Sequence, residues 1–530
     1  MKDYSNNIYI ASAVYALLFF IALLPGSLSF TTQRIGDQGD GWQNVWNLWW
    51  ARHAIENGKS LYFTDMLHYP NGHTLLLHTL SPFNAVLSIP LQYVFDLNTV
   101  YNILVLLSYV MAGVGMWTLV YHLTKNQEAS LLAGVIFAFS PFHVAHTLGH
   151  LQLISIQFIP LFFLFMIKTS EKASLSNIFL ATFFLVLNGL CSWYYYLFCL
   201  IGAIIHTIYT IVVGRDWPRF WALGMPLAFS MIILSPLHVD MLMESVKTEY
   251  GGQHNPIYYS ADVGSFLVPG EVQSWGRYVD IRASGNASEN GLFLGAAVIF
   301  LSFFAIKRKG YYSTYFLITA IVFYILSLGF YLHIFGTIYK IALPYFFLFL
   351  LFPPMRFMAM PVRFAGMGMF CLAVLAGMGA DELYRSGRRK WVTYSIIVLF
   401  SFNLLYVPFP SSALPDSYLY GMMYDFRENC SAIDLRDKNH VLYYQTKHQV
   451  PLIGGYVSRW TAESEAFLNN TPGINTIIHG YPAVDNASDY LDSYKVCYIL
   501  SYTNQTLSSA EQLNIGAVYD DGETRLYIRK

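Results

Sequence analysis

Apolar segments of about 20 residues recur along this chain, and they constrain the fold more than any other feature of the sequence. A helix needs about 20 mostly apolar residues to cross the hydrocarbon core of a bilayer. Only 12% of the residues are charged, roughly half the share in a typical soluble domain. The sequence therefore predicts an all-α polytopic membrane protein with about 11–13 transmembrane helices. The predicted spans are 8–30, 100–122, 130–147, 151–168, 176–191, 193–213, 219–237, 291–307, 312–330, 364–381 and 391–409.

Two further apolar stretches, 83–96 and 340–353, are short and interrupted by prolines, so we interpret them as interfacial or re-entrant. With these two left out, the basic loops all fall on one side of the membrane, as the positive-inside rule requires. The N-terminus is then cytoplasmic, and loops 31–99 and 238–290 lie outside the plasma (inner) membrane. The basic residues that set this orientation are Lys125, Lys168, Lys172, Arg215, Arg219, Lys307, Arg308, Lys309, Arg385, Arg388, Arg389 and Lys390.

Residues 411–530 are more polar than residues 1–410 and break the pattern of apolar helices. We predict a transmembrane domain over 1–410, followed by a small extracytoplasmic α/β domain. Its expected strands are 441–444, 496–500 and 525–528, with a tight turn at 520–522. Cys430 and Cys497 could pair in an oxidising compartment, but the spacing alone favours two unrelated thiols.

Charge and motifs narrow the functional classes. A net charge of −1 is not that of a nucleic-acid-binding protein, which needs a basic surface. The chain has no GxGxxG or P-loop motif for nucleotides, and no HExxH or paired CxxC motif for a metal. The chemistry must therefore come from residues scattered over the predicted outer loops.

Two aspartates, Asp37 and Asp40, lie in a glycine-rich run just after the first span. Tryptophans follow at positions i, i+4, i+7 and i+8, which predicts an amphipathic helix lying in the membrane interface. The Asp40 carboxylate could simply cap this helix, and Asp37 could simply form a turn. Alternatively, the pair supplies a general base and a group that orients a metal or phosphate. The tryptophans are Trp42, Trp46, Trp49 and Trp50.

Three histidines, His143, His146 and His150, follow Ser140-Pro141 near a predicted outer hairpin. Imidazoles at i and i+3 can converge on one ion, so a divalent cation such as Mg²⁺ or Mn²⁺ held by Asp40, His146 and His150 is one interpretation. The other is that these histidines bind a lipid phosphate or sugar hydroxyls in a wet vestibule. The sequence leaves both open, and no metal site is assigned.

The long loop 238–290 carries acidic and aromatic residues that suit sugar binding, because rings stack on the apolar faces of pyranoses and carboxylates bind hydroxyls. Ordinary loop polarity is the alternative for each of them, and an aromatic belt is the alternative for the Trp-Tyr run that opens the span at 193. The candidate substrate-binding residues are Glu244, Tyr259, Asp262, Glu289, Trp193 and Tyr194.

Two arginines, Arg356 and Arg363, lie beside the second interrupted segment at the start of a span. Arginine at that depth is costly unless it is paired or near the interface. Both side chains could snorkel to lipid headgroups, but a guanidinium fork also matches a lipid-linked phosphate, and we favour that interpretation.

The order of these features resembles the GT-C superfamily of membrane glycosyltransferases, which includes oligosaccharyltransferases, protein O-mannosyltransferases and the transferases that add aminoarabinose to lipid A. The resemblance covers roughly the first 400 residues and depends on the order of the motifs rather than on any one of them. The stretches that carry it are Gly39-Asp40-Gly41-Trp42 through Trp50, Phe139-Ser140-Pro141, His146 through His150, Ser192-Trp193-Tyr194-Tyr195, Tyr259-Ser260-Ala261-Asp262 and Pro361-Val362-Arg363-Phe364.

This resemblance implies a catalytic acid in the first outer loop, at Asp40, and a donor sugar carried on a polyprenyl phosphate or diphosphate. Some members have Asp-Glu at this point, whereas this chain has Asp40-Gly41, so Asp37 could replace the second acid. The implied donor/phosphate-binding residues are Arg363, Arg356, His146 and His150.

The expected function is transfer of a sugar to an extracytoplasmic glycan, lipid or protein, by a single displacement that inverts the anomeric carbon. A flippase or transporter of lipid-linked saccharides would use the same arginines and aromatic rings but no catalytic acid. A polymerase of lipid-linked saccharides would differ mainly in its acceptor. The nearly charge-free spans favour an interfacial enzyme surrounded by membrane lipids.

Overall fold

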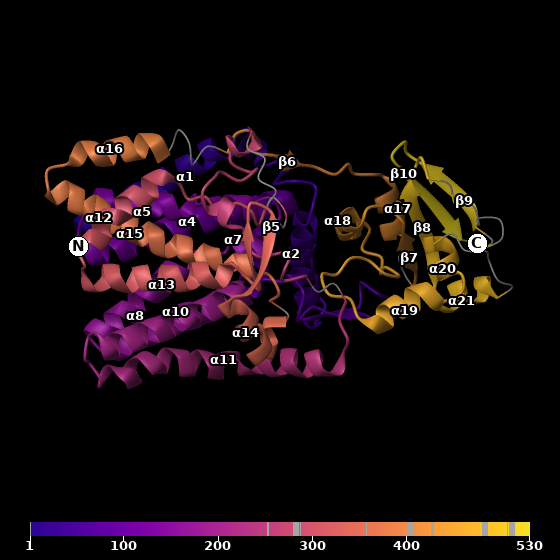
Figure 1. The fold of residues 1–530 in the computed structure, drawn as a ribbon. Helices are drawn as coiled ribbons and strands as arrows, with labels where there is room; N and C mark the ends of the chain where they lie inside the picture. The colour runs from indigo at the N-terminus through magenta and orange to yellow at the C-terminus, as the bar shows by residue number, and fades with distance from the viewer. Residues whose placement is uncertain are drawn as a thin grey trace.

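The computed structural model has a helical region and a smaller sheet-containing region that follow one another along the long axis of the molecule (Figure 1). The chain begins at the far end of the helical region, and its last strands lie at the opposite end of the molecule. The structure describes residues 2–251, 254–278, 286, 288–356, 358–399, 406–425, 429–479, 486–505, 507, 513 and 515–529.

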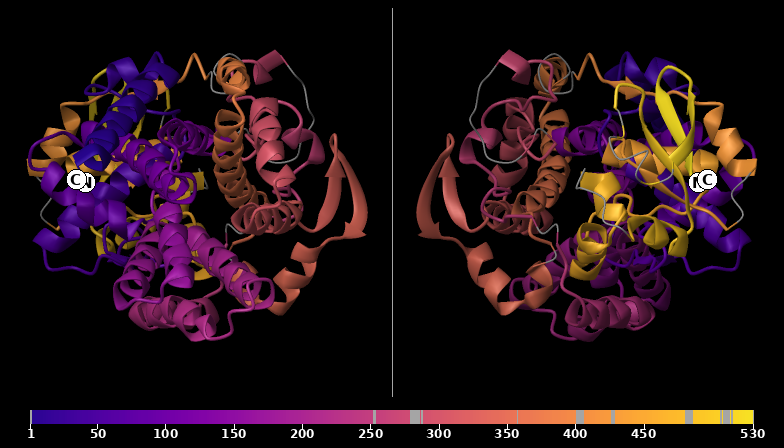
Figure 2. Two further views of the ribbon diagram at one scale, coloured as in Figure 1. Left: turned by 90° about the vertical axis from the view of Figure 1, so that its left-hand side faces the viewer. Right: turned by 90° about the vertical axis from the view of Figure 1, so that its right-hand side faces the viewer.

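Each predicted span coincides with one or two helices, although residues 400–405 of the last one lie outside the described residues. By length and composition, six helical stretches among the described residues could cross a membrane. The helices run nearly parallel, so that Figure 2 shows them end on. The helices that coincide with the predicted spans are α1 (Lys2–Ala22), α4 (Leu97–Thr124), α5 (Gln127–Ala138), α6 (Pro141–His146), α7 (Leu151–Ile154), α8 (Ile159–Glu171), α9 (Leu175–Cys191), α10 (Trp193–Val212), α11 (Arg219–Lys247), α12 (Ala296–Lys307), α13 (Tyr311–Ser327), α15 (Ala365–Arg385) and α16 (Arg389–Val398).

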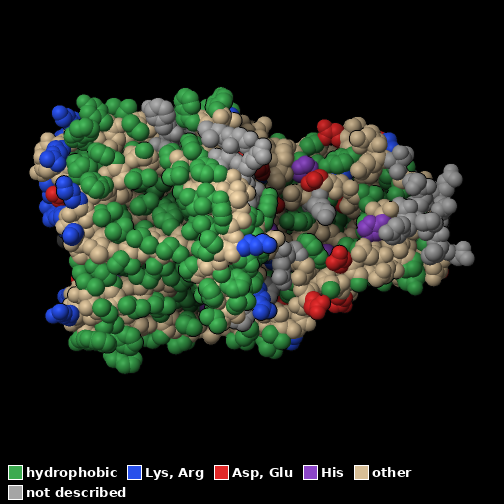
Figure 3. Space-filling model, viewed as in Figure 1, with side chains coloured by type: hydrophobic (Ala, Val, Ile, Leu, Met, Phe, Trp, Pro, Cys, Tyr) green, Lys and Arg blue, Asp and Glu red, His purple; other side chains and the backbone are tan. Residues whose placement is uncertain are grey.

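Local signals in the sequence set the ends of these helices. Asp96 caps α4 by accepting hydrogen bonds from the amides of Asn98 and Thr99, and Lys125 ends the helix in the left-handed conformation. Ser174 caps α9 in the same way. Apolar side chains cover much of the outer face of the helical region (Figure 3), as expected for helices that face lipid.

The predicted loop 238–290 begins later than expected, because α11 continues as a helix to Lys247. The two interrupted segments form short helices, α3 (Pro82–Leu91) and α14 (Pro344–Leu351). A hairpin of β4 (Tyr331–Ile334) and β5 (Thr337–Ala342) precedes α14 and lies at the edge of the molecule (Figure 2).

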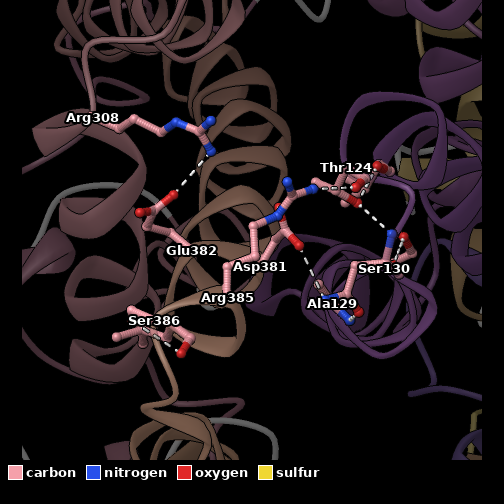
Figure 4. Close-up of polar contacts among 11 residues, drawn as sticks. Thr124, Ala129, Ser130, Arg308, Asp381, Glu382, Arg385 and Ser386 are labelled. Carbon is pink, nitrogen blue, oxygen red and sulfur yellow. Dashed lines mark hydrogen bonds and ion pairs between the residues drawn. The ribbon is translucent and has the colours of Figure 1, made fainter.

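Basic side chains gather at the end of the helical region that lies away from the sheet, where the predicted cytoplasmic loops meet (Figure 3). Several of them are paired there (Figure 4). Arg308 binds Glu382 at 2.9 Å, and Arg385 binds Asp381 at 2.8 Å. Asp381 also accepts a hydrogen bond from Asn126 at the start of α5. These contacts fasten the α4–α5 and α12–α13 corners to the end of α15.

The region after residue 410 has the predicted mixture of strands and helices. Its sheet has the order β7-β8-β10-β9, with a parallel β7–β8 pair and antiparallel neighbours. The strands are β7 (Ser431–Asp434), β8 (Val496–Tyr502), β9 (Ile515–Asp520) and β10 (Thr524–Arg529). The helices are α17 (Leu419–Asp425), α18 (Lys438–His448), α19 (Ala462–Asn470), α20 (Ile474–His479) and α21 (Ala487–Ser493).

Three sequence interpretations for this region are confirmed, and two are wrong. The strands at 496–500 and 525–528 and the turn before the latter are present. Residues 441–444 are not a strand, because they lie in α18 with all four side chains buried, and a helix buried on every side shows no amphipathic period. Cys430 and Cys497 are not unrelated thiols but form a disulfide, because pairing of β7 with β8 brings their Cα atoms within 5.5 Å.

The tryptophan helix does not lie against lipid, which corrects the sequence interpretation. In α2 (Gly41–Glu56), Trp42, Trp46 and Trp50 are fully buried. Helix α18 packs on α2, and the Trp46 indole donates a hydrogen bond of 2.8 Å to Oε1 of Gln445. The stripe has the right period for an amphipathic helix, but its apolar face is covered by a segment about 400 residues later in the chain.

Replacement of Trp46 by Ala is expected to lower the free energy of unfolding by about 3–5 kcal/mol, because it leaves a large cavity and removes the partner of Gln445. Thermal unfolding of the purified protein in detergent measures this change. Trp217→Ala, at a side chain that is 70% exposed, is the matched control and should leave the midpoint unchanged. Equal shifts in both variants would contradict the role of the α2–α18 contact.

Candidate functional site

A cavity of about 510 Å³ opens where the helical region meets the region after residue 410. Its wall combines carboxylates, imidazoles, arginines and aromatic rings from segments far apart in the chain. The lining residues used below are Asp40, Gln43, His78, Thr79, His150, Gln152, Trp193, Tyr194, His254, Tyr259, Glu289, Arg363, Tyr456, Ser458, Arg459 and Trp460.

Asp40 lies at the start of α2, yet its carboxylate makes no capping hydrogen bond to the helix. It lies instead 3.5 Å from Nε2 of His150. The hydrogen bond from His150 lowers the pKa of Asp40 below its usual value, against the opposing effect of burial, and the charges of His254 and Arg363 add to this. Asp40 is therefore ionised at neutral pH and available to accept a proton.

Close backbone packing brings Asp40 to His150. A Cβ atom on Gly149 would lie 2.8 Å from the amide nitrogen of Gly41, and a Cβ on Gly41 would overlap the guanidinium of Arg34. Asn44 donates a hydrogen bond of 2.8 Å to the carbonyl of Gly149. Glycine at position 149 thus lets the two loops approach closely, and glycine at position 41 leaves room for the Arg34 guanidinium.

Arg34, on the short strand β1 (Arg34–Ile35), holds the Asp40 loop in place from behind. Its fully buried guanidinium donates to the carbonyls of Asp37 and Leu148 and to Oγ of Ser412. It also stacks on the ring of Trp42, 4.7 Å from its centroid. Strand β1 pairs with β6 (Ser411–Ser412), so that one cation joins three segments of the chain.

A buried ion pair forms the other side of the cavity. Arg363 donates to Oε1 of Glu289 through Nε at 2.9 Å and Nη2 at 2.6 Å, and His146 lies 3.5 Å from the same oxygen. Burial alone would raise the pKa of the Glu289 carboxyl, but the charge of Arg363 outweighs it and holds this pKa below its usual range. The Arg363 guanidinium also lies over the Tyr194 ring, 4.8 Å from its centroid.

Several buried polar atoms of the cavity wall have no hydrogen-bond partner among the described residues. Such atoms are uncommon in folded proteins, because each one costs free energy unless a ligand or water satisfies it. Their position around one cavity indicates a site for a polar ligand. They are Nε2 of Gln43, Nε2 of His78, Oγ1 of Thr79, Oε1 of Gln152 and Oε2 of Glu289.

The structure brings most of the predicted site residues together. Asp40, His150, Trp193, Tyr194, Tyr259, Glu289 and Arg363 all line the cavity. His146 lies behind it, against Glu289. His143 is buried away from it, where its ring stacks on Tyr109.

Four predicted site residues lie elsewhere. Asp37 accepts a hydrogen bond from the Gly39 amide in a turn. Glu244 is hydrogen-bonded to the hydroxyls of Thr248 and Tyr250. The other two, Asp262 and Arg356, also point away from the cavity.

Asp262 is fully buried, where its carboxylate accepts hydrogen bonds from the amides of Gly264, Phe335 and Gly336 and so organises its own loop and the β4–β5 turn. Arg356 is exposed and does not line the cavity. Both residue types suit substrate binding, but the Asp262 carboxylate is used in local hydrogen bonds and the Arg356 side chain does not line the cavity.

Sequence reasoning missed the segment 454–460, which contributes Tyr456, Ser458, Arg459 and Trp460 to the cavity. We call this segment the strap. Its backbone is held on one side by His68, whose amide donates to the Gly454 carbonyl, and on the other by the Gly251 amide, which donates to Trp460. Gly454-Gly455 in the sequence indicates a sharp bend, but nothing in it shows that the residues after the bend line the same cavity as Asp40.

The predicted divalent cation would need ligands beyond the protein side chains near Asp40. Among the described residues, no group of three or more His, Cys, Asp or Glu side chains is arranged to hold a metal ion. Asp40 and His150 offer one carboxylate and one imidazole, a donor set that suits Mn²⁺ better than Mg²⁺. Substrate oxygens or water would have to complete such a shell.

Replacement of Glu289 by Ala leaves Arg363 buried without its carboxylate, so we expect the free energy of unfolding to fall by about 3–5 kcal/mol. The change is measured as a lower thermal midpoint in detergent. The control is Glu382→Ala, which breaks the exposed pair with Arg308 and should cost no more than about 1 kcal/mol. Similar losses in the two variants would contradict the expectation that the buried Arg363–Glu289 pair is the costlier one to break.

Removal of the His150 imidazole is expected to raise the pKa of Asp40 towards its usual value, because that hydrogen bond is the largest cause of the lowering. If Asp40 is the base, the acidic limb of the pH–activity profile should move to higher pH in His150→Ala. His150→Asn keeps a donor and should move it less. If the acidic limb stays at the same pH in both variants, the ionisation of Asp40 does not limit activity.

The fold is shared with solved GT-C glycosyltransferases. The apo oligosaccharyltransferase of Archaeoglobus fulgidus superposes with a TM-score of 0.51 at 13% identity, over 99% of this chain and 74% of that chain. The arabinofuranosyltransferase AftD from Mycobacteria superposes with a TM-score of 0.58 at 14% identity, over 98% of this chain but only 41% of that longer chain. At these identities the likeness concerns the fold, which is of the GT-C type.

Sequence comparison identifies a family for this chain, but the description of that family names no activity. No curated protein sequence matches this chain. One family model, described as a domain of unknown function and designated DUF6311, matches residues 12–359. Because this match covers more than half of the chain, the protein belongs to the DUF6311 family.

Proposed function

We propose that this protein is a membrane glycosyltransferase that moves a sugar from a polyprenyl-phosphate or polyprenyl-diphosphate donor to an extracytoplasmic glycan, lipid or protein. One observation carries the proposal. In a GT-C fold, an ionised carboxylate (Asp40) and a buried arginine (Arg363) line the same cavity, together with polar atoms that lack protein partners. These groups match the two charge changes that glycosyl transfer requires.

The first charge change occurs at the acceptor. Asp40 takes the proton of an acceptor hydroxyl as its oxygen attacks the anomeric carbon of the donor sugar. His150 keeps the carboxylate ionised before the reaction and oriented towards the cavity. A single attack from the side opposite the phosphate inverts the configuration at that carbon. Asp37 has no part in this step, since its carboxylate is used in a turn.

The second charge change occurs at the leaving group. As the bond between the anomeric carbon and the phosphate oxygen breaks, the lipid phosphate takes up the electron pair and gains negative charge. Arg363 is fixed by Glu289 beside the cavity, and Arg459 of the strap lines the cavity as well. Positively charged groups held in place before the reaction stabilise this developing charge without reorganisation. Arg356 does not line the cavity and is not assigned this role.

The remaining wall residues suit a sugar between these two groups. Trp193, Tyr194 and Tyr259 present aromatic rings. The Nε2 atoms of Gln43 and His78 have no partner among the described residues and can donate hydrogen bonds to hydroxyl oxygens, since Nδ1 of His78 already accepts one from the Ser458 amide. The wall thus combines aromatic rings with polar side chains that can bind the hydroxyls of a sugar.

Two features support an orientation with the cavity outside the cytoplasm. Basic side chains gather at the opposite end of the helical region, as the positive-inside rule expects of a cytoplasmic face. The Cys430–Cys497 disulfide suits an oxidising, extracytoplasmic compartment. We therefore propose a multi-pass protein of the plasma membrane with a cytoplasmic N-terminus.

Asp40→Asn is expected to reduce sugar transfer by roughly 10²–10⁴-fold, the usual contribution of a general base. The measurement is the mass profile of glycolipids and surface glycans from cells that carry the wild type, the variant or no protein. The variant and the deletion should both lack one sugar and accumulate the same lighter acceptor. Asp37→Asn is the matched control, three residues away, and should keep the wild-type profile.

If Asp40→Asn is expressed normally and keeps the wild-type profile while the deletion changes it, Asp40 is not a base. A flippase or transporter of lipid-linked saccharides would then account for the phenotype. If the deletion loses whole repeat units rather than one sugar, the protein is a polymerase.

A further inference from the structure

A second cavity, of about 400 Å³, is lined by residues of the region after residue 410 and by His68. Tyr456 and Trp460 of the strap line both this cavity and the one that holds Asp40. The strap therefore forms a common wall between the two spaces. The other lining residues are His68, Ile433, Asp434, Leu435, Arg436, Val441, Ile453, Gly454, Gly455, Val457, Glu465, Leu468 and Ile478.

The second cavity has the composition of a binding site rather than of a packing defect. Aliphatic side chains of β7 and α19 form one part of its wall, and the Trp460 ring, which is 36% exposed, forms another. His68 is 6% exposed, and its Nε2 atom has no hydrogen-bond partner among the described residues. Glu465 accepts a hydrogen bond of 3.2 Å from the Trp460 indole, which orients ring and carboxylate together.

This combination suits a saccharide. An aromatic face stacks on the C–H face of a pyranose, and a carboxylate and an imidazole bind its hydroxyls, whereas the aliphatic wall excludes water. A phosphate is not favoured, because the Arg436 guanidinium is already bound to Asp434 at 2.5 Å in a fully buried pair. The chemistry of the wall therefore resembles that required of an acceptor sugar, not of a donor lipid phosphate.

The common wall also lies next to the proposed base. Burial and then the negative charge of Asp40 raise the pKa of the Tyr456 phenol to about 12. Tyr456 and Asp40 also line the same cavity. A chain of sugars with one hydroxyl at Asp40 would thus meet Tyr456 and Trp460 next.

We infer that the second cavity binds the acceptor unit adjacent to the one that is glycosylated, so that the natural acceptor is an oligosaccharide or a glycoconjugate of at least two sugar units. This inference rests on the proposed function, and it names the class of acceptor. The terminal unit lies by Asp40 in the first cavity, and the next unit stacks on Trp460, which lines both cavities, on the side of the second.

The test uses the lighter glycan that accumulates in deletion cells as acceptor and the lipid-phosphate fraction of the same cells as donor. Leu468→Trp fills the second cavity and should raise the apparent KM for the glycan about tenfold, with the apparent KM for the donor fraction unchanged within twofold. Glu465→Gln, which changes volume little, should raise the apparent KM for the glycan severalfold. Both measurements use the full-length protein in detergent or vesicles.

Ala466→Trp is the matched control, because Ala466 is exposed on the same helix, α19, and lines neither cavity. It should leave both KM values unchanged. The inference is overturned if Leu468→Trp and Glu465→Gln both keep the wild-type KM for the glycan, or if the two KM values rise together. A wild-type protein that transfers no sugar at all would overturn the proposed function itself. Normal transfer by the wild type together with unchanged KM values in the second-cavity variants would overturn only the inference about the acceptor.

Discussion

The buried pair of Arg363 and Glu289 is the interaction on which the site depends. Two opposite charges out of water are tolerable only when the hydrogen bonds between them have good geometry. Here Oε1 of Glu289 accepts two hydrogen bonds from Arg363, and His146 approaches the same oxygen. The pair joins the start of α15 to the segment before α12 and to α6. It thereby fixes the Arg363 guanidinium beside a cavity whose wall also carries the Asp40 carboxylate and the Arg459 guanidinium.

The opposite wall depends on backbone packing rather than on charge pairing. Gly149 allows two loops to touch, and Gly41 leaves room for Arg34. Arg34 closes the contact from behind by binding carbonyl groups of both loops. The consequence is that Asp40 faces His150 instead of capping its own helix. A rigid acid and a rigid cation on opposing segments are what differential stabilisation of a transition state requires, since neither has to be reorganised during reaction.

The accuracy of sequence reasoning followed the range of the interactions involved. Helices were predictable because their apolar length and caps, such as Asp96 before α4, are local. Asp40, Glu289 and Arg363 were predictable as acids and a cation at the ends of spans. Asp262 was misassigned because it binds amides around residue 335, and Arg459 was missed because its segment is placed by hydrogen bonds to 68–78 and 249–251. Neither set of long-range hydrogen bonds produces a periodic pattern or a motif of fixed spacing in the sequence.

The sequence by itself determined the helical membrane-protein composition, the positions of most helices and the sheet-forming segments at the end of the chain, because each depends on apolar length, caps and turns within about 30 residues. Tertiary structure alone decided what the tryptophans of α2 face, how Cys430 meets Cys497, and which charged residues share a cavity. Those outcomes depend on pairing between segments up to about 400 residues apart. Side-chain type shows that a residue can take part in such a contact, whereas only the packed chain selects its partner.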